Sequence, residues 1–494
     1  MNVADLLRAA ADAHPDGSAL VGPGRPPVTF REWDAEADRV ARALPGLGVG
    51  PGDRVALGMH NVPEFAFAYF GVLRAGAVAV PLNVMLTEPE VERILDDAGA
   101  RMVLTAPPFD AVVDRAAASL GCADRVISTD RWERLGPLDG PPVTGNAGDG
   151  DLAVLAYTSG TTGEPRGAML SHGNLIANLR QQMAVPEDEV TRDDVLLLAL
   201  PLFHIFGLNV TLGLVVLNGA TGVLVERFDP VETLRLIERH KVTVLFGAPP
   251  MYVGWLRAAA DDTYDLSSVR IAVSGAAPLA IDVLHAFKKR FGIDVFEGYG
   301  MTETAPTITS GRVSERPRPG SVGKPLPEIE LRLVDEDGRD VELGDPGEIV
   351  VRGPNVFSGY WQRPEETEQS LRDGWFSTGD VAVRDEDGYL YLVDRKRDLI
   401  LVSGFNVFPS EVENALLRHP AVAEAAVIGV PHPYSGEAVR AYVVLETGAT
   451  LTERELLADV STRLARFKCP DRIEIVDELP HLLTGKVLRR ALRT

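Results

Sequence analysis

A run of glycines, hydroxyl side chains and one cation occupies residues 156–174, which read AYTSGTTGEPRGAMLSHGN. Because glycine has no Cβ, consecutive backbone N–H groups can turn toward a single anion. Arg166 adds positive charge, although the spacing is not the Walker pattern, which ends in Gly-Lys-Ser/Thr. Four hydroxyls add hydrogen-bond donors: Thr158, Ser159, Thr161 and Thr162. The segment predicts a phosphate site. The alternative, a mobile Ser/Gly linker, is disfavoured by Pro165 and the apolar flanks.

A second group of side chains lies in GYGMTETAP, residues 298–306. Tyr299 offers a flat ring for a nucleobase, and Thr302 and Glu303 offer a hydroxyl and a carboxylate. Oxygen ligands of this kind are the ones that Mg²⁺ prefers. A Gly-Tyr-Gly turn that enters a capped helix would explain the same residues without any ligand.

Two single residues nearer the C-terminus could complete a nucleotide site. Asp380, at the end of GWFSTGD, could accept hydrogen bonds from both hydroxyls of a ribose. Lys486, in LPHLLTGKVLRR, follows a glycine on a short loop and could reach into the site of another domain. Taken alone, a turn aspartate and a solvent-exposed lysine explain these two residues as well.

The elements that must position these residues alternate between strands and helices. Apolar runs such as RVALGM, AVAVPL, VTVLFGA and RIAVSGA predict strands, and EPEVERILDDAG, PVETLRLIERH and IDVLHAFKKRFG predict the helices between them. This alternation predicts an α/β fold with a large N-terminal domain of βαβ-type sheets. From about residue 320 the pattern changes to strands and turns, which predicts an antiparallel β subdomain up to residue 394.

A charged cluster, DRKRD, lies at residues 394–398 between two apolar runs. Beyond it the helix SEVENALLRHP and the strands AEAAVIGV, RAYVVLE and RIEIVDEL predict a small α+β domain. We therefore expect an N-terminal domain over residues 1–394, a hinge at about 394–398, and a C-terminal domain over 395–494. A length of 494 residues suits two or more domains.

The composition excludes several classes of protein. A formal net charge of −22 argues against nucleic acid as a partner, because nucleic-acid binders need a basic face. Two isolated cysteines, Cys122 and Cys469, form no disulfide framework or metal spacing and fit a reducing cytoplasm. The apolar stretch LNVTLGLVVLNGATGVLV is interrupted by Asn209 and Asn218, which predicts a buried helix, a turn and a strand, not a membrane span. A monomer and a homodimer are both compatible with the sequence.

In their order, these motifs resemble those of the adenylate-forming (ANL) superfamily, specifically acyl-CoA synthetases, and are similar also to those of 4-coumarate–CoA ligases. The motifs are YTSGTTGEPRG, YGMTE, TGD, DRKRD with GFNVFPSEVE, and TGK, and the resemblance runs from TFREWDAEADRVARAL to Lys486. It implies an adenylation domain and a small mobile C-terminal domain that carries the catalytic lysine. One departure is Arg166, where relatives usually carry lysine. A guanidinium keeps the charge and adds a planar fork of donors.

The resemblance implies two half-reactions with ATP, Mg²⁺ and coenzyme A. A carboxylate displaces pyrophosphate from ATP to give an acyl-adenylate, and a thiol then displaces AMP. The catalytic residues would be Lys486, Thr302 and Glu303, with Glu303 also binding the metal. The implied ATP/AMP site comprises Thr158, Ser159, Gly160, Thr161, Thr162, Gly163, Arg166, Gly275, Ala276, Ala277, Glu297, Gly298, Tyr299, Gly300, Asp380 and Arg395.

The resemblance also implies an acyl pocket, a pivot and a thiol site. The pocket would be walled by Phe203, His204, Phe206 and Gly207. Arg397 matches the pivot of a C-terminal domain that rotates between the two half-reactions. Coenzyme A would meet Ser403, Gly404, Phe405 and Lys468, although a surface lysine is the more ordinary role for the last.

The choice of acid rests on the residues around the implied pocket. His204 stands where amino-acid-activating relatives carry aspartate, and APPMYVGW offers no cation for a second carboxylate. An apolar monocarboxylic acid is therefore expected, with a medium- or long-chain fatty acid favoured because Gly207, Gly298 and Gly300 could leave a long slot. A coumarate- or benzoate-like aryl acid is the close alternative.

Other functions remain open beside a fatty-acid–CoA ligase. The thiol could belong to an acyl carrier protein, although the short EDGRDVELGDPGEIVVRG lacks the insertion that ligases loading such proteins often have. A non-catalytic binder on the same fold should have lost Glu303 or Lys486, and both are present. Oxidative chemistry after adenylation, as in beetle luciferases, has no support in the sequence.

Overall fold

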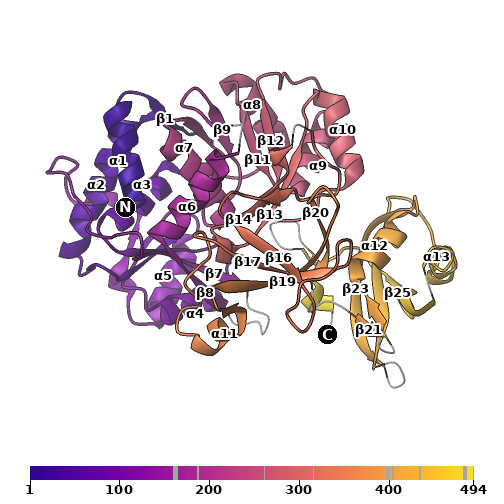
Figure 1. Cartoon of the computed structure of the whole chain (residues 1–494). Helices are drawn as coiled ribbons and strands as arrows, with labels where there is room; N and C mark the ends of the chain where they lie inside the picture. The colour runs from indigo at the N-terminus through magenta and orange to yellow at the C-terminus, as the bar shows by residue number, and fades with distance from the viewer. Residues whose placement is uncertain are drawn as a thin grey trace. The chain divides into compact units, whose positions relative to one another are not determined.

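The computed structural model describes the chain except for residues 160–164, 186–188, 261, 315, 396–399, 403–404, 433–435, 465, 482–486 and 493–494. The described chain forms two compact units, which we call unit 1 and unit 2. Unit 1 comprises Met1–Glu330 and Arg352–Phe376, and unit 2 comprises Leu331–Val351 and Ser377–Thr494. Figure 1 traces the chain from its indigo N-terminal helices to its yellow C-terminal segment.

The first sheet of unit 1 has six strands. They are β3 (Arg54–Gly58), β4 (Val78–Pro81), β5 (Met102–Thr105), β6 (Val126–Ser128), β7 (Leu152–Ser159) and β8 (Pro165–Ser171). Their order is β6-β5-β3-β4-β7-β8, and the parallel strands β3, β4 and β5 are continuous apolar runs, as expected for strands buried on both faces. The helices of this part of the chain are α1 (Ala4–Ala13), α2 (Phe30–Gly46), α3 (Pro63–Arg74), α4 (Glu88–Ala98), α5 (Asp110–Ser119) and α6 (His172–Met183).

The second sheet of unit 1 has nine strands. They are β1 (Ser18–Val21), β2 (Val28–Thr29), β9 (Val195–Leu198), β10 (Thr221–Leu224), β11 (Val244–Gly247), β12 (Ile271–Ser274), β13 (Phe296–Gly300), β14 (Thr307–Ser310) and β15 (Lys324–Pro325). Their order is β15-β14-β13-β12-β11-β9-β10-β1-β2. Its helices are α7 (Gly213–Asn218), α8 (Pro230–His240), α9 (Pro249–Ala258) and α10 (Ile281–Phe291), and a π-helix spans Phe206–Leu212. Figure 1 shows α8, α9 and α10 beside this sheet, where Tyr252, Trp255 and Phe287 form a fully buried core.

The remaining strands form two smaller sheets. The third sheet contains β16 (Glu330–Val334), β17 (Gly347–Arg352), β18 (Leu371–Arg372), β19 (Trp375–Arg384) and β20 (Leu390–Arg395), and α11 (Pro364–Ser370) precedes β18. The fourth contains β21 (Ile400–Val402), β22 (Phe405–Val407), β23 (Val422–His432), β24 (Gly436–Leu445) and β25 (Arg472–Ile475), with helices α12 (Pro409–Leu417) and α13 (Glu453–Val460). Single 3-10 turns lie at Ala123–Arg125, Thr129–Leu135, Thr302–Thr304, Gly311–Val313, Arg466–Lys468 and Arg489–Leu492.

This architecture confirms the predicted fold class, a large α/β region and a smaller α+β region. The apolar stretch that contains Asn209 and Asn218 forms a helix, a turn and strand β10, as expected. In the part of the chain that the structure describes, no helix is long and apolar enough to cross a membrane. The predicted domain boundary stays a prediction, because most of the hinge lies outside the described residues.

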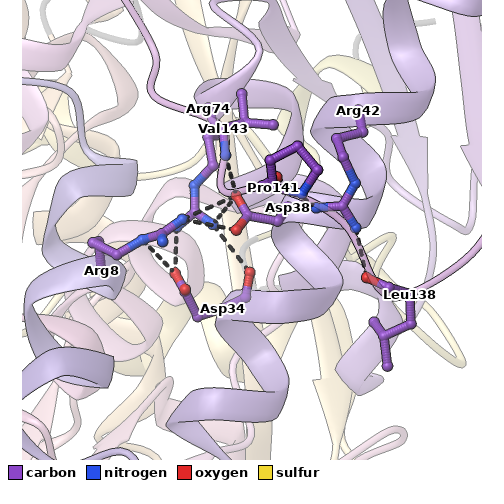
Figure 2. Close-up of polar contacts among 8 residues, drawn as sticks. All are labelled: Arg8, Asp34, Asp38, Arg42, Arg74, Leu138, Pro141 and Val143. Carbon is purple, nitrogen blue, oxygen red and sulfur yellow. Dashed lines mark hydrogen bonds and ion pairs between the residues drawn. The ribbon is translucent and has the colours of Figure 1, made fainter.

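A buried ion-pair network fastens the N-terminal helices of unit 1 to one another (Figure 2). Arg74 on α3 is 3% exposed and donates to Asp34 at 2.6 Å and to Asp38 at 2.8 Å, both on α2. Arg8 on α1 also pairs with Asp38, at 2.9 Å, and the backbone N–H of Val143 donates to the same carboxylate. Removing one partner of such a network leaves the other charges buried and uncompensated.

We expect Arg74→Met to lower the free energy of unfolding by about 3–5 kcal/mol, because both aspartates lose their main partner. Urea unfolding of the variant and the wild type measures the change. Arg42→Met is the matched control, since Arg42 donates to the backbone carbonyls of Leu138 and Pro141 (Figure 2) and, within the described part of the chain, pairs with no carboxylate. Equal losses for the two variants would contradict the assignment.

His172 fastens the N-terminal segment to the start of α6. The ring is fully buried, and its Nδ1 accepts a hydrogen bond from the backbone N–H of Val3 at 3.0 Å. Burial lowers the pKa of His172 from 6.5 to about 4, so the folded protein holds the neutral ring. Its stabilising contribution is therefore fully present above pH 6.5 and is lost as the pH falls toward 4.

His172→Asn should flatten the dependence of stability on pH between 6.5 and 4. Asparagine keeps an acceptor for Val3 but has no proton to gain. The wild type should lose on the order of 3 kcal/mol more than the variant across that window. Urea unfolding at several pH values measures the difference, and parallel pH profiles for the two proteins would show that His172 is not responsible.

Candidate active site

The Ser/Thr/Gly segment closes an antiparallel hairpin of the six-stranded sheet. β7 and β8 pair so that Thr158 lies opposite Arg166. The side chain of Ser159 and the whole of Gly160, Thr161, Thr162 and Gly163 lie outside the described residues. Their contacts with phosphate stay a prediction. The segment joins two strands, whereas a Walker loop joins a strand to a helix, which agrees with the absence of the Walker pattern.

Three other predicted segments follow the carboxyl ends of parallel strands in the nine-stranded sheet. β9 leads to the implied acyl-pocket residues, β12 leads to residues 275–277, and β13 contains and leads to residues 297–303. In open α/β sheets, ligands bind outside these ends. The ring of Phe206 contacts Gly275 so closely that a Cβ at residue 275 would lie 2.9 Å from it. The structure therefore brings one residue of the predicted acyl pocket against one residue of the predicted nucleotide site.

One buried polar atom at these strand ends, Ser274 Oγ, has no hydrogen-bond partner among the described residues. Ser274 lies opposite Glu297 in the parallel register. Glu297 Oε1 accepts from the backbone N–H of Leu279 at 2.9 Å, and burial raises the pKa of Glu297 against the backbone N–H groups of Leu279 and Gly320, which lower it. Nearby, Ala276 holds a φ of 70°, a conformation that alanine seldom adopts outside functional or turn positions. The free hydroxyl of Ser274 fits a ligand with donors and acceptors of its own, as adenine has.

Glu303 is buried and held by the segment that precedes α11. It lies in the 3-10 turn Thr302–Thr304 and is 5% exposed. The hydroxyl of Tyr360 donates to Glu303 Oε1 at 2.8 Å, and the backbone N–H of Phe357 donates to the Glu303 carbonyl at 2.8 Å. Burial, followed by the charge of Glu303, raises the pKa of Tyr360, so that its hydroxyl keeps the proton it donates.

Arg166 lies on the face of the same tyrosine. Its Cζ is 4.8 Å from the centroid of the Tyr360 ring, and its Nη1 donates to Glu366 Oε2 at 3.0 Å. Residues 358–361 also pair with β8 through backbone hydrogen bonds, including one of 2.8 Å from Trp361. The hairpin that carries the Ser/Thr/Gly segment is thus joined directly to the residue that holds Glu303.

The implied acyl pocket begins where β9 ends. His204 is partly buried, and its Nδ1 accepts a hydrogen bond from the backbone N–H of Phe206 at 3.3 Å. Burial lowers the pKa of His204, which favours the neutral ring at pH 7. The rings of Phe206 and Phe246 pack edge to face, with their centroids 6.1 Å apart. Asn209 of the π-helix donates to the carbonyl of Ala305 at 2.7 Å, which ties this wall to the turn that carries Glu303. Phe203 is also partly buried.

Of the three glycines predicted to leave a long slot for a fatty acid, Gly207 and Gly300 have their free space taken by backbone. A Cβ at Gly207 would lie 2.2 Å from the carbonyl of Pro201, and a Cβ at Gly300 would lie 2.0 Å from the carbonyl of Pro306. A Cβ at Gly298 would also be close, 3.2 Å from the carbonyl of Thr309. At Gly207 and Gly300 the missing side chains make room for neighbouring backbone, so these two glycines say nothing about the length of the acid.

The remaining predicted residues belong to unit 2. Asp380 is buried and lies directly opposite Arg395 in the antiparallel pairing of β19 with β20, although the side chain of Arg395 is outside the described part. Lys468 donates to both oxygens of Glu411 at 2.7 and 2.8 Å, an ion pair that accounts for it without coenzyme A. Arg397, Ser403, Gly404, the side chain of Phe405 and Lys486 lie outside the described residues.

Both cysteines, Cys122 and Cys469, are partly buried free thiols. Burial raises the pKa of Cys122 and of Cys469, so both favour the thiol form. Within the described ranges, no group of three or more His, Cys, Asp or Glu residues could hold a metal alone. Mg²⁺ needs no such group, because it keeps water ligands and is bound by one or two carboxylates together with substrate phosphates. The buried, hydrogen-bonded carboxylate of Glu303 fits that mode.

Comparison with known sequences decides the family. The family described as AMP-binding enzyme matches residues 7–361, and the one described as AMP-binding enzyme C-terminal domain matches residues 411–486. The chain belongs to the AMP-binding enzymes. It is 36% identical over 530 aligned positions to the long-chain-fatty-acid–CoA ligase of Bacillus subtilis, covering 99% of this chain and 93% of that one. It is 40% identical over 467 positions to a feruloyl-CoA synthase of Amycolatopsis, covering 94% and 93%.

A solved structure agrees with this assignment. The crystal structure of ATP-bound MatB from Rhodopseudomonas palustris matches with a TM-score of 0.92 and 37% identity, covering 100% of this chain and 98% of that chain. The α/β architecture described above is therefore that of known AMP-binding enzymes.

Two residues of this AMP-binding enzyme contact predicted site residues but were not predicted from the sequence. Tyr360 holds Glu303, and Glu366 holds Arg166. The only local signal for Tyr360 is its place in the aromatic-rich GPNVFSGYW, which reads equally well as a strand and turn. Contacts between segments this far apart in sequence leave no periodic pattern.

We expect Gly300→Ala to destabilise the AMP-binding enzyme by about 1–3 kcal/mol and to raise the KM for ATP, because the added Cβ collides with the Pro306 carbonyl. Gly298→Ala is the matched control, since its Cβ would approach the Thr309 carbonyl only to 3.2 Å. Thermal unfolding and initial-rate kinetics measure both effects. Equal behaviour of the two variants would contradict the packing role assigned to Gly300.

Proposed function

We propose that this AMP-binding enzyme is an ATP-dependent acyl-CoA synthetase, an AMP-forming acid–thiol ligase. It activates an apolar monocarboxylic acid as an acyl-adenylate and transfers the acyl group to coenzyme A. The observation that carries the proposal is the contact between Phe206 and Gly275, which sets the implied acyl pocket beside the nucleotide segment. The names of the two relatives above, a fatty-acid–CoA ligase and a feruloyl-CoA synthase, support the same reaction class.

The first half-reaction brings two anions together, so its barrier is largely electrostatic. In the proposed mechanism the Ser/Thr/Gly segment binds the departing pyrophosphate through its N–H groups and hydroxyls, and Thr302 donates near the α-phosphate. The ammonium of Lys486 pairs with the acid and the α-phosphate together. Mg²⁺, held by Glu303 when bound, neutralises phosphate charge. Tyr299, Glu297 and residues 275–277 hold the adenine, and Asp380 with Arg395 holds the ribose.

In the second half-reaction the thiol must reach the acyl-adenylate from the position that Lys486 occupies in the first. In the proposal the C-terminal domain, residues 395–494, rotates about Arg397 after adenylation, which withdraws Lys486 and brings the Ser403–Asn406 segment to the thiol path. The domain boundary, the hinge and the thiol site all remain proposals, as do a cytoplasmic location and the oligomeric state.

The acid belongs to one of two classes. A medium- or long-chain fatty acid is favoured by the relatives named long-chain-fatty-acid–CoA ligase. An aryl acid is favoured by the feruloyl-CoA synthase, which is 40% identical to this chain, and by the aromatic pair of Phe206 with Phe246 at the pocket wall. Because Gly207 and Gly300 do not support a long slot, neither class of acid is favoured over the other.

We expect AMP release that requires ATP, coenzyme A and either a fatty or an aryl acid, measured across a panel of chain lengths, cinnamates, benzoates and dicarboxylates. Lys486→Ala should lower AMP formation from acid and ATP by at least about a thousandfold, since one charge at the transition state is lost. The same variant should still form thioester from a supplied acyl-adenylate.

Two outcomes would count against the proposal. Absence of AMP release with every acid and coenzyme A would refute the synthetase assignment, and loading of a carrier protein in that case would identify the acceptor instead. Equal loss of both half-reactions in Lys486→Ala would refute the division of labour between the two half-reactions.

A further inference from the structure

Three side chains from separate segments of unit 1 form one continuous line of contacts. Arg166 comes from β8, Tyr360 from the segment before α11, and Glu303 from the turn after β13. The guanidinium of Arg166 covers the ring of Tyr360 at 4.8 Å, and the hydroxyl of that ring donates to Glu303 at 2.8 Å. Tyr360 is therefore held at its face by a cation and at its hydroxyl by a carboxylate.

We propose that Tyr360 and Arg166 are positioning residues for Glu303: Tyr360 fixes the rotation of the carboxylate that binds Mg²⁺, and Arg166 fixes Tyr360. The inference rests on the proposed function, because that function assigns Mg²⁺ to Glu303. It adds that the cation of the Ser/Thr/Gly hairpin acts on the metal site through a tyrosine. Through Tyr360, the hairpin proposed to bind phosphate and the carboxylate proposed to bind Mg²⁺ are held in a fixed position relative to each other.

The geometry accounts for arginine at position 166, where a lysine is usual in the resembling family. A guanidinium is planar, so it can lie flat on the Tyr360 ring while one of its nitrogens donates sideways to Glu366. An ammonium has no such plane and is more strongly hydrated, so it satisfies the ring and the carboxylate together less well. The arginine is thus matched to Tyr360 and Glu366.

Glu366 holds the guanidinium of Arg166 in place over the Tyr360 ring. It lies on α11, where it also approaches Arg363 at 3.9 Å, and Arg363 in turn approaches Asp97 of α4 at 3.6 Å. Arg166 is held by this chain of charges on one side and by the Tyr360 ring on the other. Because the group is partly buried, its ion pairs are screened less than surface pairs.

The primary test is Tyr360→Phe, which removes the hydroxyl and keeps the ring under Arg166. Binding of ATP is followed by isothermal titration calorimetry over a series of MgCl₂ concentrations, without acid or coenzyme A, so that no turnover occurs. We expect the Mg²⁺ concentration for half-maximal effect to rise about tenfold, as for loss of a hydrogen bond to a metal ligand. Affinity for ATP in the presence of EDTA should change by less than about twofold, which a general structural defect would not produce.

Tyr157→Phe is the matched control for this variant. Tyr157 lies on β7 of the same hairpin, and its hydroxyl donates to a different carboxylate, that of Asp97 on α4, at 2.5 Å. Asp97 is linked to Arg166 only at the far end of the chain of charges, through two ion pairs of 3.6 and 3.9 Å. The control removes the same kind of hydrogen bond and should leave the Mg²⁺ dependence unchanged. If Tyr360→Phe behaves like Tyr157→Phe, the positioning role of Tyr360 is refuted.

The role of Arg166 is tested by Arg166→Lys with Arg363→Lys as its control, since both arginines pair with Glu366 and only Arg166 covers the ring. Arg166→Lys should raise the Mg²⁺ requirement about 2–5-fold, the value of a lost cation–π contact. In the double variant Arg166→Lys/Tyr360→Phe, the effect should not exceed that of Tyr360→Phe alone. Multiplication of the two effects would show that Arg166 does not act through the Tyr360 hydroxyl.

The outcomes separate this inference from the proposed function. If the wild type binds no ATP at any Mg²⁺ concentration, the proposed function fails and the inference fails with it. If the wild type binds MgATP but the Tyr360 and Tyr157 variants agree, only the inference fails. Should Tyr360→Phe not fold, the comparison of Arg166→Lys with Arg363→Lys decides, and equal Mg²⁺ dependence in that pair refutes the inference.

Discussion

A buried carboxylate needs donors, and the site of this AMP-binding enzyme is organised around one such group. Glu303 is almost completely buried, so its charge is tolerated only because hydrogen bonds replace the water it has lost. The donor found for it, the hydroxyl of Tyr360, lies on a segment that pairs with β8 of the six-stranded sheet. This hydrogen bond therefore joins that sheet to the nine-stranded sheet, in which the turn of Glu303 lies between β13 and β14. The same contact holds the hairpin of β7 and β8, which carries the predicted phosphate segment.

Much of the fold could be predicted from the sequence, because the relevant signals are local. The apolar runs of β3, β4, β11 and β12 are continuous, and α4, α8 and α10 show helical periodicity, with a glycine after α4 and α10, so each was predicted where it occurs. The nucleotide site stays a prediction that rests on the order of the motifs, since each motif alone has an ordinary structural explanation. In contrast, Tyr360 and Glu366 act through contacts with residues 57 and 200 positions away, and such contacts leave no local pattern.

The glycines show where reasoning from residue size fails. A small residue in a binding motif can make room either for a ligand or for neighbouring backbone, and the sequence does not distinguish the two. At Gly207 and Gly300 the room is taken by the carbonyls of Pro201 and Pro306. The length of the acid must be decided by other side chains of the proposed pocket, where Phe206 packs edge to face on Phe246.

In the proposed reaction the protein joins a carboxylic acid to AMP before any thiol takes part, and every later step depends on this one. Exchange of labelled pyrophosphate into ATP, measured with an acid and Mg²⁺ but without coenzyme A, tests that claim directly because it reports only the reversible first half-reaction. We predict exchange that appears on addition of a fatty or aryl acid and vanishes when the acid is withheld. A folded, ATP-binding protein that shows no acid-dependent exchange with any member of those classes would contradict the account.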